Sequence, residues 1–382
     1  MDKLTPKKEK LPEWAPQEGG KGFACHVVEG VEGGHDGIAA YSGTKPISGS
    51  PRCKRPSLTV NDYVEGVLKA DRAILGRTIT LVESNSAAHM ELAQKVLKKL
   101  LPYTGRSIRI GITGVPGVGK STFIEAFGRY LLEKGYKPAV LAVDPSSSIT
   151  GGSILGDKTR MESLSRDNRC FIRPSPSSGT LGGVARKSRE TMLVCEAAGY
   201  DVLLIETVGV GQSEITVRSM VDFFILLMLA GAGDELQGIK KGIIELADAI
   251  LITKADGNNK TLAKAARNEY ANALHYLRPA TEGWQTEVFT CSAVTGEGIS
   301  KIWSLIDNFR TKTMESGAFE SRRRRQALKW MHTMLSEQLR AIFFKNPSVV
   351  KALPEIEKEV LNDTITPTFA VNSLINIFEG NT

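Results

Sequence analysis

A glycine-rich segment between residues 114 and 121 carries the clearest chemistry in the sequence. It reads Gly-Val-Pro-Gly-Val-Gly-Lys-Ser and matches the pattern GxxxxGK[ST] in full. Its glycines let backbone N–H groups turn inward around phosphate oxygens, and the positive end of the following helix adds attraction. We expect Lys120 to reach the β- and γ-phosphates of a nucleotide and Ser121 to bind Mg²⁺. The predicted phosphate-binding residues are Gly114, Val115, Pro116, Gly117, Val118, Gly119, Lys120, Ser121 and Thr122.

Two carboxylates follow apolar runs that are typical of buried strands. Asp144 comes directly after residues 139–143, and Glu206 comes directly after residues 202–205. In an open parallel sheet, ligands bind beyond the carboxyl ends of the strands. We therefore predict that Asp144 and Glu206 join Ser121 in holding Mg²⁺, although a carboxylate at a strand end could also cap a helix.

The residues after Glu206 predict a nucleotide-sensing loop. The sequence Glu-Thr-Val-Gly places Gly209 where its amide can sense the γ-phosphate. Gln212 could orient the attacking water, but it lies three positions beyond that glycine instead of directly after it. Gln212 could equally be a switch residue, with the water oriented by the backbone or by a partner. The predicted catalytic residues are Lys120, Glu206, Gly209 and Gln212.

A later segment indicates which base is bound. Thr253-Lys254-Ala255-Asp256 resembles the NKxD motif of GTPases, with Thr in place of Asn. The carboxylate of Asp256 can accept hydrogen bonds from N1–H and the 2-amino group of guanine. Adenine lacks both donors and would leave that carboxylate unpaired, which favours GTP over ATP. Ser292-Ala293 resembles the element that contacts guanine from the other side. The predicted base-reading residues are Thr253, Lys254, Asp256, Ser292 and Ala293.

These residues need a parallel sheet to bring them together. Apolar runs that we interpret as strands alternate with amphipathic helical stretches after Gly105. This alternation predicts an α/β fold of the P-loop NTPase type, with a mostly parallel sheet flanked by helices. The predicted strands are residues 108–112, 139–143, 202–205, 223–229, 249–252 and 288–291.

Helical segments flank this domain on both sides. One helical pattern from Leu58 is expected to stop at Gly76, and another runs from about residue 87 to 101. Helix spacing returns after about residue 310. Arg322–Arg325 is either a contact for an acidic partner or nucleic acid, or a solvated helix start or linker. The predicted domains are a flexible extension (1–57), an N-terminal helical segment (58–104), a nucleotide-binding domain (105–310) and a C-terminal helical arm (311–382).

Composition excludes several classes of protein. The 382 residues are 41% hydrophobic and 24% charged, which is normal for a globular chain. The longest apolar run, residues 223–233, is shorter than the roughly 20 residues that span a membrane. The net charge of +7 is too small to indicate nucleic-acid binding by itself. The five cysteines form no CxxC pair, so we expect no disulfide framework or structural zinc, and a reducing, cytoplasmic location.

Four segments together resemble the MeaB-type GTPases, a family associated with methylmalonyl-CoA mutase and formerly described as transport kinases. They are residues 111–121, 144–148, 206–213 and 232–242. The resemblance implies a slow GTPase that acts as a chaperone of an adenosylcobalamin-dependent acyl-CoA mutase in cofactor loading, protection and reactivation. It also implies a homodimer formed by the C-terminal arm, and a switch loop in which Asp234, Gln237 and Lys240 transmit the nucleotide state. Methylmalonyl-, isobutyryl- and ethylmalonyl-CoA mutase all remain possible partners.

Three other functions share the phosphate loop. A metallochaperone would need clustered His or Cys ligands, but the five histidines are scattered. A protein-targeting GTPase would need a Met-rich binding domain, but the nine methionines are spread along the chain. A small-molecule or protein kinase would need a catalytic base beside an acceptor pocket, and no separate substrate domain is visible.

Overall fold

The protein is described by a computed structural model. The structure describes residues 58–143, 161–174, 181–207, 212–231 and 241–380. The predicted extension (1–57) and five predicted site residues lie outside them. These five are Asp144, Gly209, Asp234, Gln237 and Lys240.

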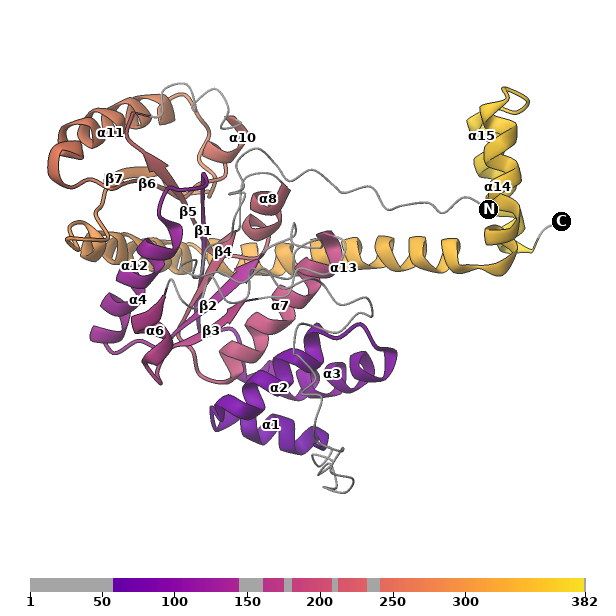
Figure 1. Ribbon diagram of the computed structural model, residues 1–382, viewed down its shortest axis with the longest axis horizontal. Coiled ribbons are helices and arrows are strands. Elements are labelled where there is room, and N and C mark those ends of the chain that lie inside the picture. The colour runs from indigo at the N-terminus through magenta and orange to yellow at the C-terminus, as the bar shows by residue number, and fades with distance from the viewer. Residues whose placement is uncertain (1–57, 144–160, 175–180, 208–211, 232–240, 381–382) are drawn as a thin grey trace, which may run out of the picture. The chain divides into compact units, whose positions relative to one another are not determined.

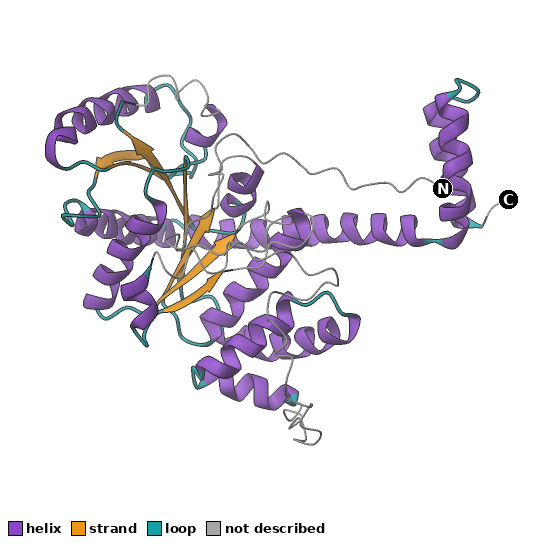
Figure 2. Ribbon diagram, viewed as in Figure 1, coloured by secondary structure: helices purple, strands orange, loops and turns teal. Residues whose placement is uncertain are grey.

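A parallel sheet of seven strands forms the centre of the fold, in the order β3-β2-β4-β1-β5-β6-β7 (Figures 1 and 2). The strands are β1 (Ile108–Gly114), β2 (Pro138–Val143), β3 (Phe171–Pro174), β4 (Val202–Thr207), β5 (Phe223–Leu229), β6 (Ala249–Thr253) and β7 (Glu287–Thr290). Every pairing in this sheet is parallel, which confirms the predicted fold class. Sequence reasoning missed β3, a four-residue edge strand that ends in a proline.

Both faces of the sheet are covered because successive side chains of each strand point to opposite sides. On β4, Leu203 and Ile205 join one hydrophobic cluster, whereas Val202 and Leu204 join another. The first face packs against α7 (Leu181–Ala197), α8 (Gln212–Arg218), α10 (Lys241–Ile244) and α11 (Lys260–Leu274). The second packs against α4 (Lys120–Glu133), α6 (Glu162–Arg166) and α12 (Ile299–Glu315). The core residues of both faces are buried, so the sheet is a rigid base for its loops.

Three N-terminal helices extend the first hydrophobic cluster. They are α1 (Val60–Leu68), α2 (Arg72–Glu83) and α3 (Ala87–Leu100), followed by the short 3-10 turn η1 (Leu101–Tyr103). The prediction that a helix stops at Gly76 was wrong, because α2 continues through this residue. The break comes earlier, where Asp71 caps α2 by accepting hydrogen bonds from the amides of Ala73 and Ile74.

The chain ends in the helices α13 (Ala318–Lys345), α14 (Pro347–Leu361) and α15 (Pro367–Glu379). An apolar stripe on α13 stays exposed. Its members are Leu328, Met331, Leu335, Leu339 and Ile342, each more than half exposed. No helix in the described part of the chain has the length and apolarity needed to cross a membrane.

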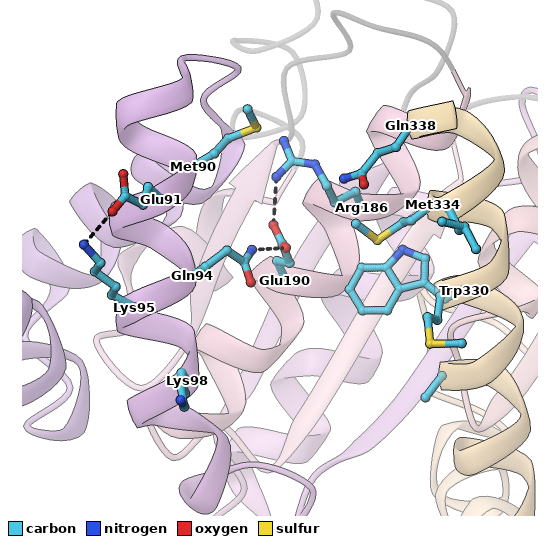
Figure 3. Close-up of a pocket in the computed structure, with 13 residues that line it drawn as sticks. Met90, Glu91, Gln94, Lys95, Lys98, Arg186, Glu190, Trp330, Met334 and Gln338 are labelled. Carbon is cyan, nitrogen blue, oxygen red and sulfur yellow. Dashed lines mark hydrogen bonds and ion pairs between the residues drawn. The ribbon is translucent and has the colours of Figure 1, made fainter. Parts of the chain in front are cut away.

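The same helix forms one wall of a groove that α3 and α7 complete (Figure 3). The groove has a volume of about 990 Å³. Trp330 and Met334 line it from α13, and Met90 lines it from α3. At its base, Glu190 of α7 accepts hydrogen bonds from Gln94 at 2.7 Å and from Arg186 at 3.1 Å. The groove is therefore an apolar surface with a paired carboxylate at its base.

Candidate nucleotide-binding site

The predicted phosphate loop lies at the carboxyl end of β1, the central strand. The carboxyl ends of β4, β6 and β7 meet at the same edge of the sheet because all of these strands are parallel. They bring Glu206, Asp256 and Ser292 to the edge that holds Lys120. The topology thus gathers, at one edge, Lys120 and Ser292, which are 172 positions apart in the sequence.

Two glycines shape the loop. Gly119 directly precedes α4 and has a φ of 96°, a left-handed conformation that glycine adopts at no steric cost. A Cβ on Gly114 would lie 2.6 Å from the carbonyl oxygen of Leu227, so any larger residue would push β1 away from β5. Both glycines are therefore required for the loop to turn tightly over the sheet into the amino terminus of α4.

Lys120 lies folded over this loop. Its Nζ donates hydrogen bonds to the carbonyl oxygens of Gly114 at 2.7 Å and Val115 at 3.3 Å. Burial lowers the pKa of the Lys120 ammonium, and the carboxylates of Glu206 and Glu214 act in the opposite direction. Lys120 thus contributes a half-buried positive charge, and partial removal from water strengthens its attraction for phosphate.

Ser121 and Glu206 form the described part of the predicted metal site. Ser121 Oγ, in the first turn of α4, donates a hydrogen bond to Glu206 Oε1 at 3.2 Å. Glu206 is only 5% exposed. A hydroxyl and a carboxylate oxygen suit Mg²⁺, which prefers hard oxygen ligands and keeps others from substrate phosphates and water. The residues therefore fit the ion, which when bound would neutralise phosphate charge.

The predicted base-reading residues also lie together. Ser292 Oγ donates a hydrogen bond to Asp256 Oδ2 at 2.5 Å, which links the loops after β6 and β7. Lys254 has a φ of 53°, and its Cε lies 4.0 Å from where a Cβ on Gly119 would be. The aliphatic part of Lys254 thus lies beside the phosphate loop, and Asp256 lies two residues farther along.

Thr253 stands at the position of the usual Asn of NKxD. Its Oγ1 donates a hydrogen bond to the carbonyl oxygen of Val118 at 2.8 Å and lies 3.2 Å from that of Met228. The buried hydroxyl therefore joins the predicted phosphate loop to the end of β6. Sequence reasoning named Thr253 but did not predict this link.

Other predicted residues are placed with less detail. Gln212 begins α8, and its side chain lies outside the described residues. Ala293 is half-buried directly after Ser292, and Thr122 is exposed on α4. Sequence reasoning missed Glu214, which is fully buried in α8 and acts on the charge of Lys120. Glu214 lies eight residues after Glu206, on the helix that follows the predicted sensing loop. This position could have indicated that it lies near the phosphate site.

Comparison with known proteins gives the family. A family model described as methylmalonyl Co-A mutase-associated GTPase MeaB matches residues 75–348. This chain belongs to the MeaB family. The GTPase ArgK of Escherichia coli is 48% identical over 316 residues, which cover 83% of this chain and 96% of that protein.

Two further MeaB-family relatives agree with this assignment. The mitochondrial methylmalonic aciduria type A homolog of Mus musculus is 46% identical over 331 residues, covering 84% of this chain and 80% of that protein. The crystal structure of an LAO/AO transport system kinase is 40% identical with a TM-score of 0.69, covering 85% of this chain and 99% of that one. The predicted family is thus confirmed.

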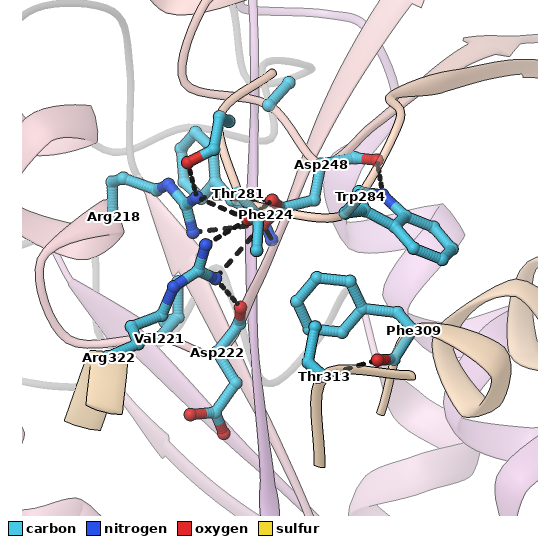
Figure 4. A network of polar contacts seen from close by, with 12 residues as sticks. Arg218, Val221, Asp222, Phe224, Asp248, Thr281, Trp284, Phe309, Thr313 and Arg322 are labelled. Carbon is cyan, nitrogen blue, oxygen red and sulfur yellow. Dashed lines mark hydrogen bonds and ion pairs between the residues drawn. The ribbon is translucent and has the colours of Figure 1, made fainter. Parts of the chain in front are cut away.

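The basic run on α13 of this MeaB-family chain has a role that neither predicted alternative described. Arg323 forms an ion pair with Asp222 at 2.5 Å. Arg322 donates hydrogen bonds to the Asp222 carbonyl and the Thr281 hydroxyl (Figure 4). Both arginine side chains are about 15% exposed. They fix the start of α13 to the amino-terminal edge of the sheet, so this half of the run makes contacts inside the chain.

Proposed function

We propose that this chain binds and slowly hydrolyses GTP with Mg²⁺, and that it assists an adenosylcobalamin-dependent acyl-CoA mutase. The observation that carries the nucleotide part is the contact of Asp256 with Ser292 beside a phosphate loop that Thr253 holds in place. Such a pre-ordered carboxylate selects guanine, because adenine would leave it without donors.

Each residue has a separate task in this proposal. Backbone amides of residues 114–121 and the Lys120 ammonium hold the phosphates, and Ser121 and Glu206 hold Mg²⁺ with support from Asp144. Gly209 senses the γ-phosphate. Gln212 either orients water or acts as a switch residue. The loop that contains Asp234, Gln237 and Lys240 would then transmit the nucleotide state, GTP or GDP, to the partner.

The family and its relatives support the assignment of a mutase partner. The family description contains methylmalonyl Co-A mutase, and the mouse relative is named for methylmalonic aciduria. We infer that the chaperone aids cofactor loading, protection and reactivation of the mutase. Turnover without the partner would be on the order of 10⁻⁴ to 10⁻² s⁻¹, as in P-loop GTPases without an activator.

We also propose that the chain forms a homodimer through its C-terminal helices. The exposed stripe on α13 supports this, because contiguous apolar surface of this kind marks interaction sites. Met331 and Leu335 belong both to the stripe and to the groove in Figure 3, so a partner helix could cover both at once. We further propose a cytoplasmic location and domain boundaries at residues 57, 104 and 310.

The nucleotide part is tested by comparing hydrolysis of GTP and ATP by the purified chain. The proposal expects slow, Mg²⁺-dependent turnover of GTP and none of ATP above background. Equal use of both nucleotides would overturn the role assigned to Asp256. Transfer of phosphate to a small molecule or protein would instead favour the kinase alternative.

A further inference from the structure

A second polar site lies at the amino-terminal edge of the sheet, away from the phosphate loop. It is a pocket of about 380 Å³, which we call the basic pocket. The end of α8, the segment around Thr281 and the first turns of α13 form its walls. Its charged lining residues are Arg218, Glu282, Arg322, Arg325 and Lys329. Four cations thus face one carboxylate in the lining.

The buried part of the basic pocket holds two guanidinium groups against one carboxylate (Figure 4). Arg218 Nη1 lies 3.0 Å from Asp248 Oδ2, and Arg322 Nη1 lies 3.7 Å from the same oxygen. Asp248 is fully buried and also accepts hydrogen bonds from the Phe224 amide and the Thr281 hydroxyl. One carboxylate therefore serves two arginines that are 11% and 15% exposed.

The outer part of the basic pocket adds more positive charge. Arg325 and Lys329 follow Arg322 by three and seven residues, so they lie on the same face of α13. Neither side chain has a hydrogen-bond or ion-pair partner among the described residues, and both are exposed. Asp222, whose carboxylate also acts on Arg322, is paired with Arg323. Positive charge therefore exceeds negative charge in and around the pocket.

The Arg322 guanidinium reflects this surplus of positive charge. Burial lowers its pKa, the carboxylates of Asp248 and Asp222 oppose the effect, and the neighbouring Arg218 and Arg325 lower the pKa further. An added anion would relieve the repulsion among these cations.

We propose that the basic pocket binds a small anion that carries a phosphate group, either free phosphate or a phosphomonoester. Guanidinium groups match phosphate oxygens with paired, charge-assisted hydrogen bonds, which is why arginine predominates in such sites. The pocket volume is in the range of small-ligand sites and leaves room for an organic part beside the phosphate. This site is separate from the nucleotide site and does not depend on the proposed mutase function.

The bound anion would join two helices of the fold. Arg218 ends α8, the helix that follows the nucleotide-sensing loop, and Arg322 begins the arm helix α13. These two elements already touch, since Gln326 of α13 donates a hydrogen bond to the carbonyl of Arg218, the last residue of α8, at 3.5 Å. An anion in the pocket would strengthen this contact and raise the thermal midpoint of unfolding.

The test measures inorganic phosphate binding to the full chain by isothermal titration calorimetry. Saturating GDP and Mg²⁺ occupy the phosphate loop, so only a second site gives heat. We expect saturable binding that the double variant Arg325→Ala/Lys329→Ala weakens by about tenfold or more. The matched variant Arg324→Ala/Arg340→Ala removes the same charge from α13 outside the pocket and should bind as the wild type does.

Two results would overturn the proposal. One is the absence of phosphate binding when GDP is present. The other is equal weakening in both double variants, which would indicate attraction to net charge and not a built site. Glycerol 3-phosphate distinguishes the sources: tighter binding than inorganic phosphate supports an organic phosphomonoester, and equal binding supports free phosphate. Unchanged GTP turnover in the variants separates this outcome from any failure of the nucleotide proposal.

Discussion

Ser121 Oγ donates a hydrogen bond to Glu206 Oε1 at 3.2 Å, which links the first turn of α4 to the end of β4. This contact joins the phosphate loop to the segment that leads into the nucleotide-sensing loop. A Mg²⁺ ion held by the hydroxyl would therefore be felt directly at Glu206. The pair is therefore a direct described contact between the phosphate-binding helix and the strand that precedes the segment proposed to switch.

Replacing Glu206 with Gln should weaken the binding of Mg²⁺. The amide keeps the size of the side chain but removes the negative charge that attracts the ion. We expect the Mg²⁺ concentration for half-maximal GTP hydrolysis to rise by about 10- to 100-fold. Titration of Mg²⁺ at fixed GTP measures this. The matched change Glu133→Gln, at the exposed end of α4, should have no effect, and an unchanged Mg²⁺ requirement in Glu206→Gln would remove Glu206 from the metal site.

Replacing Asp256 with Asn should change the base preference. The carboxylate that accepts two guanine donors becomes an amide with its own donor, so GTP affinity should fall by at least about 100-fold. Xanthine carries an acceptor where guanine has the 2-amino group. The affinity for XTP should therefore rise relative to the affinity for GTP. Competition between GTP and XTP measures the switch, with exposed Asp307→Asn as control. Retained guanine preference would refute the base-reading role.

Replacing Asp248 with Ala should destabilise the fold. The change leaves the guanidinium groups of Arg218 and Arg322 buried without their shared carboxylate, at a cost of about 3–5 kcal/mol in the free energy of unfolding. Chemical denaturation measures the loss. Arg324→Ala breaks only an exposed ion pair with Glu320 and should change stability by less than about 1 kcal/mol. Similar values for both variants would show that the buried network contributes little.

Two carboxylates on α7 should make contributions to the free energy of unfolding that depend on pH in opposite directions. Burial raises the pKa of Glu196, but Arg109, Ser107 and the Gly105 amide outweigh burial and hold it below the ordinary 4.5. Its folded form therefore binds fewer protons than its unfolded form. The stability that it contributes is complete above about pH 4.5 and is lost as pH falls through the lower folded pKa.

Glu190 has the opposite sign because burial raises its pKa against the effect of Arg186 and Gln94. Its contribution is present below the ordinary pKa and is lost as pH rises through the folded value. Denaturation between pH 3 and 6 should therefore show a shallower acid loss in Glu196→Gln and a steeper one in Glu190→Gln. Identical slopes in the two variants would contradict the assigned shifts.

Replacing Leu335 with Arg should disrupt the proposed homodimer. This side chain is 51% exposed on the apolar stripe, and a charge there could not be buried against a second copy. Light scattering after size-exclusion chromatography should give a dimer for the wild type and a monomer for the variant. Leu262→Arg, at a site 56% exposed on α11, should remain dimeric. A monomeric wild type would disprove the dimer.

The fold and the positions of the site loops followed from local patterns in the sequence. Continuous apolar runs such as 223–229 became buried parallel strands, and the polar residues at their ends met at one edge. Strand β3 was missed because four residues with a terminal proline carry too little periodicity. The helix end predicted at Gly76 was wrong because an isolated glycine destabilises a helix by only about 1 kcal/mol. The packing of α2 offsets this cost.

Long-range polar contacts could not be predicted in this way. The pairing of Arg323 with Asp222 joins residues 101 positions apart, and a run of arginines looks the same whether it faces water or a buried carboxylate. The link from Thr253 to Val118 likewise depends on how two loops approach each other. Such contacts are set by tertiary packing and leave no local signature.

The measurement that tests the central claim most directly is GTP hydrolysis by the purified chain with and without purified adenosylcobalamin-dependent acyl-CoA mutases. The variant Lys120→Ala and ATP in place of GTP serve as controls. We predict slow turnover of GTP alone that one mutase raises and that Lys120→Ala abolishes. GTP turnover that no methylmalonyl-, isobutyryl- or ethylmalonyl-CoA mutase changes would contradict the proposed chaperone function.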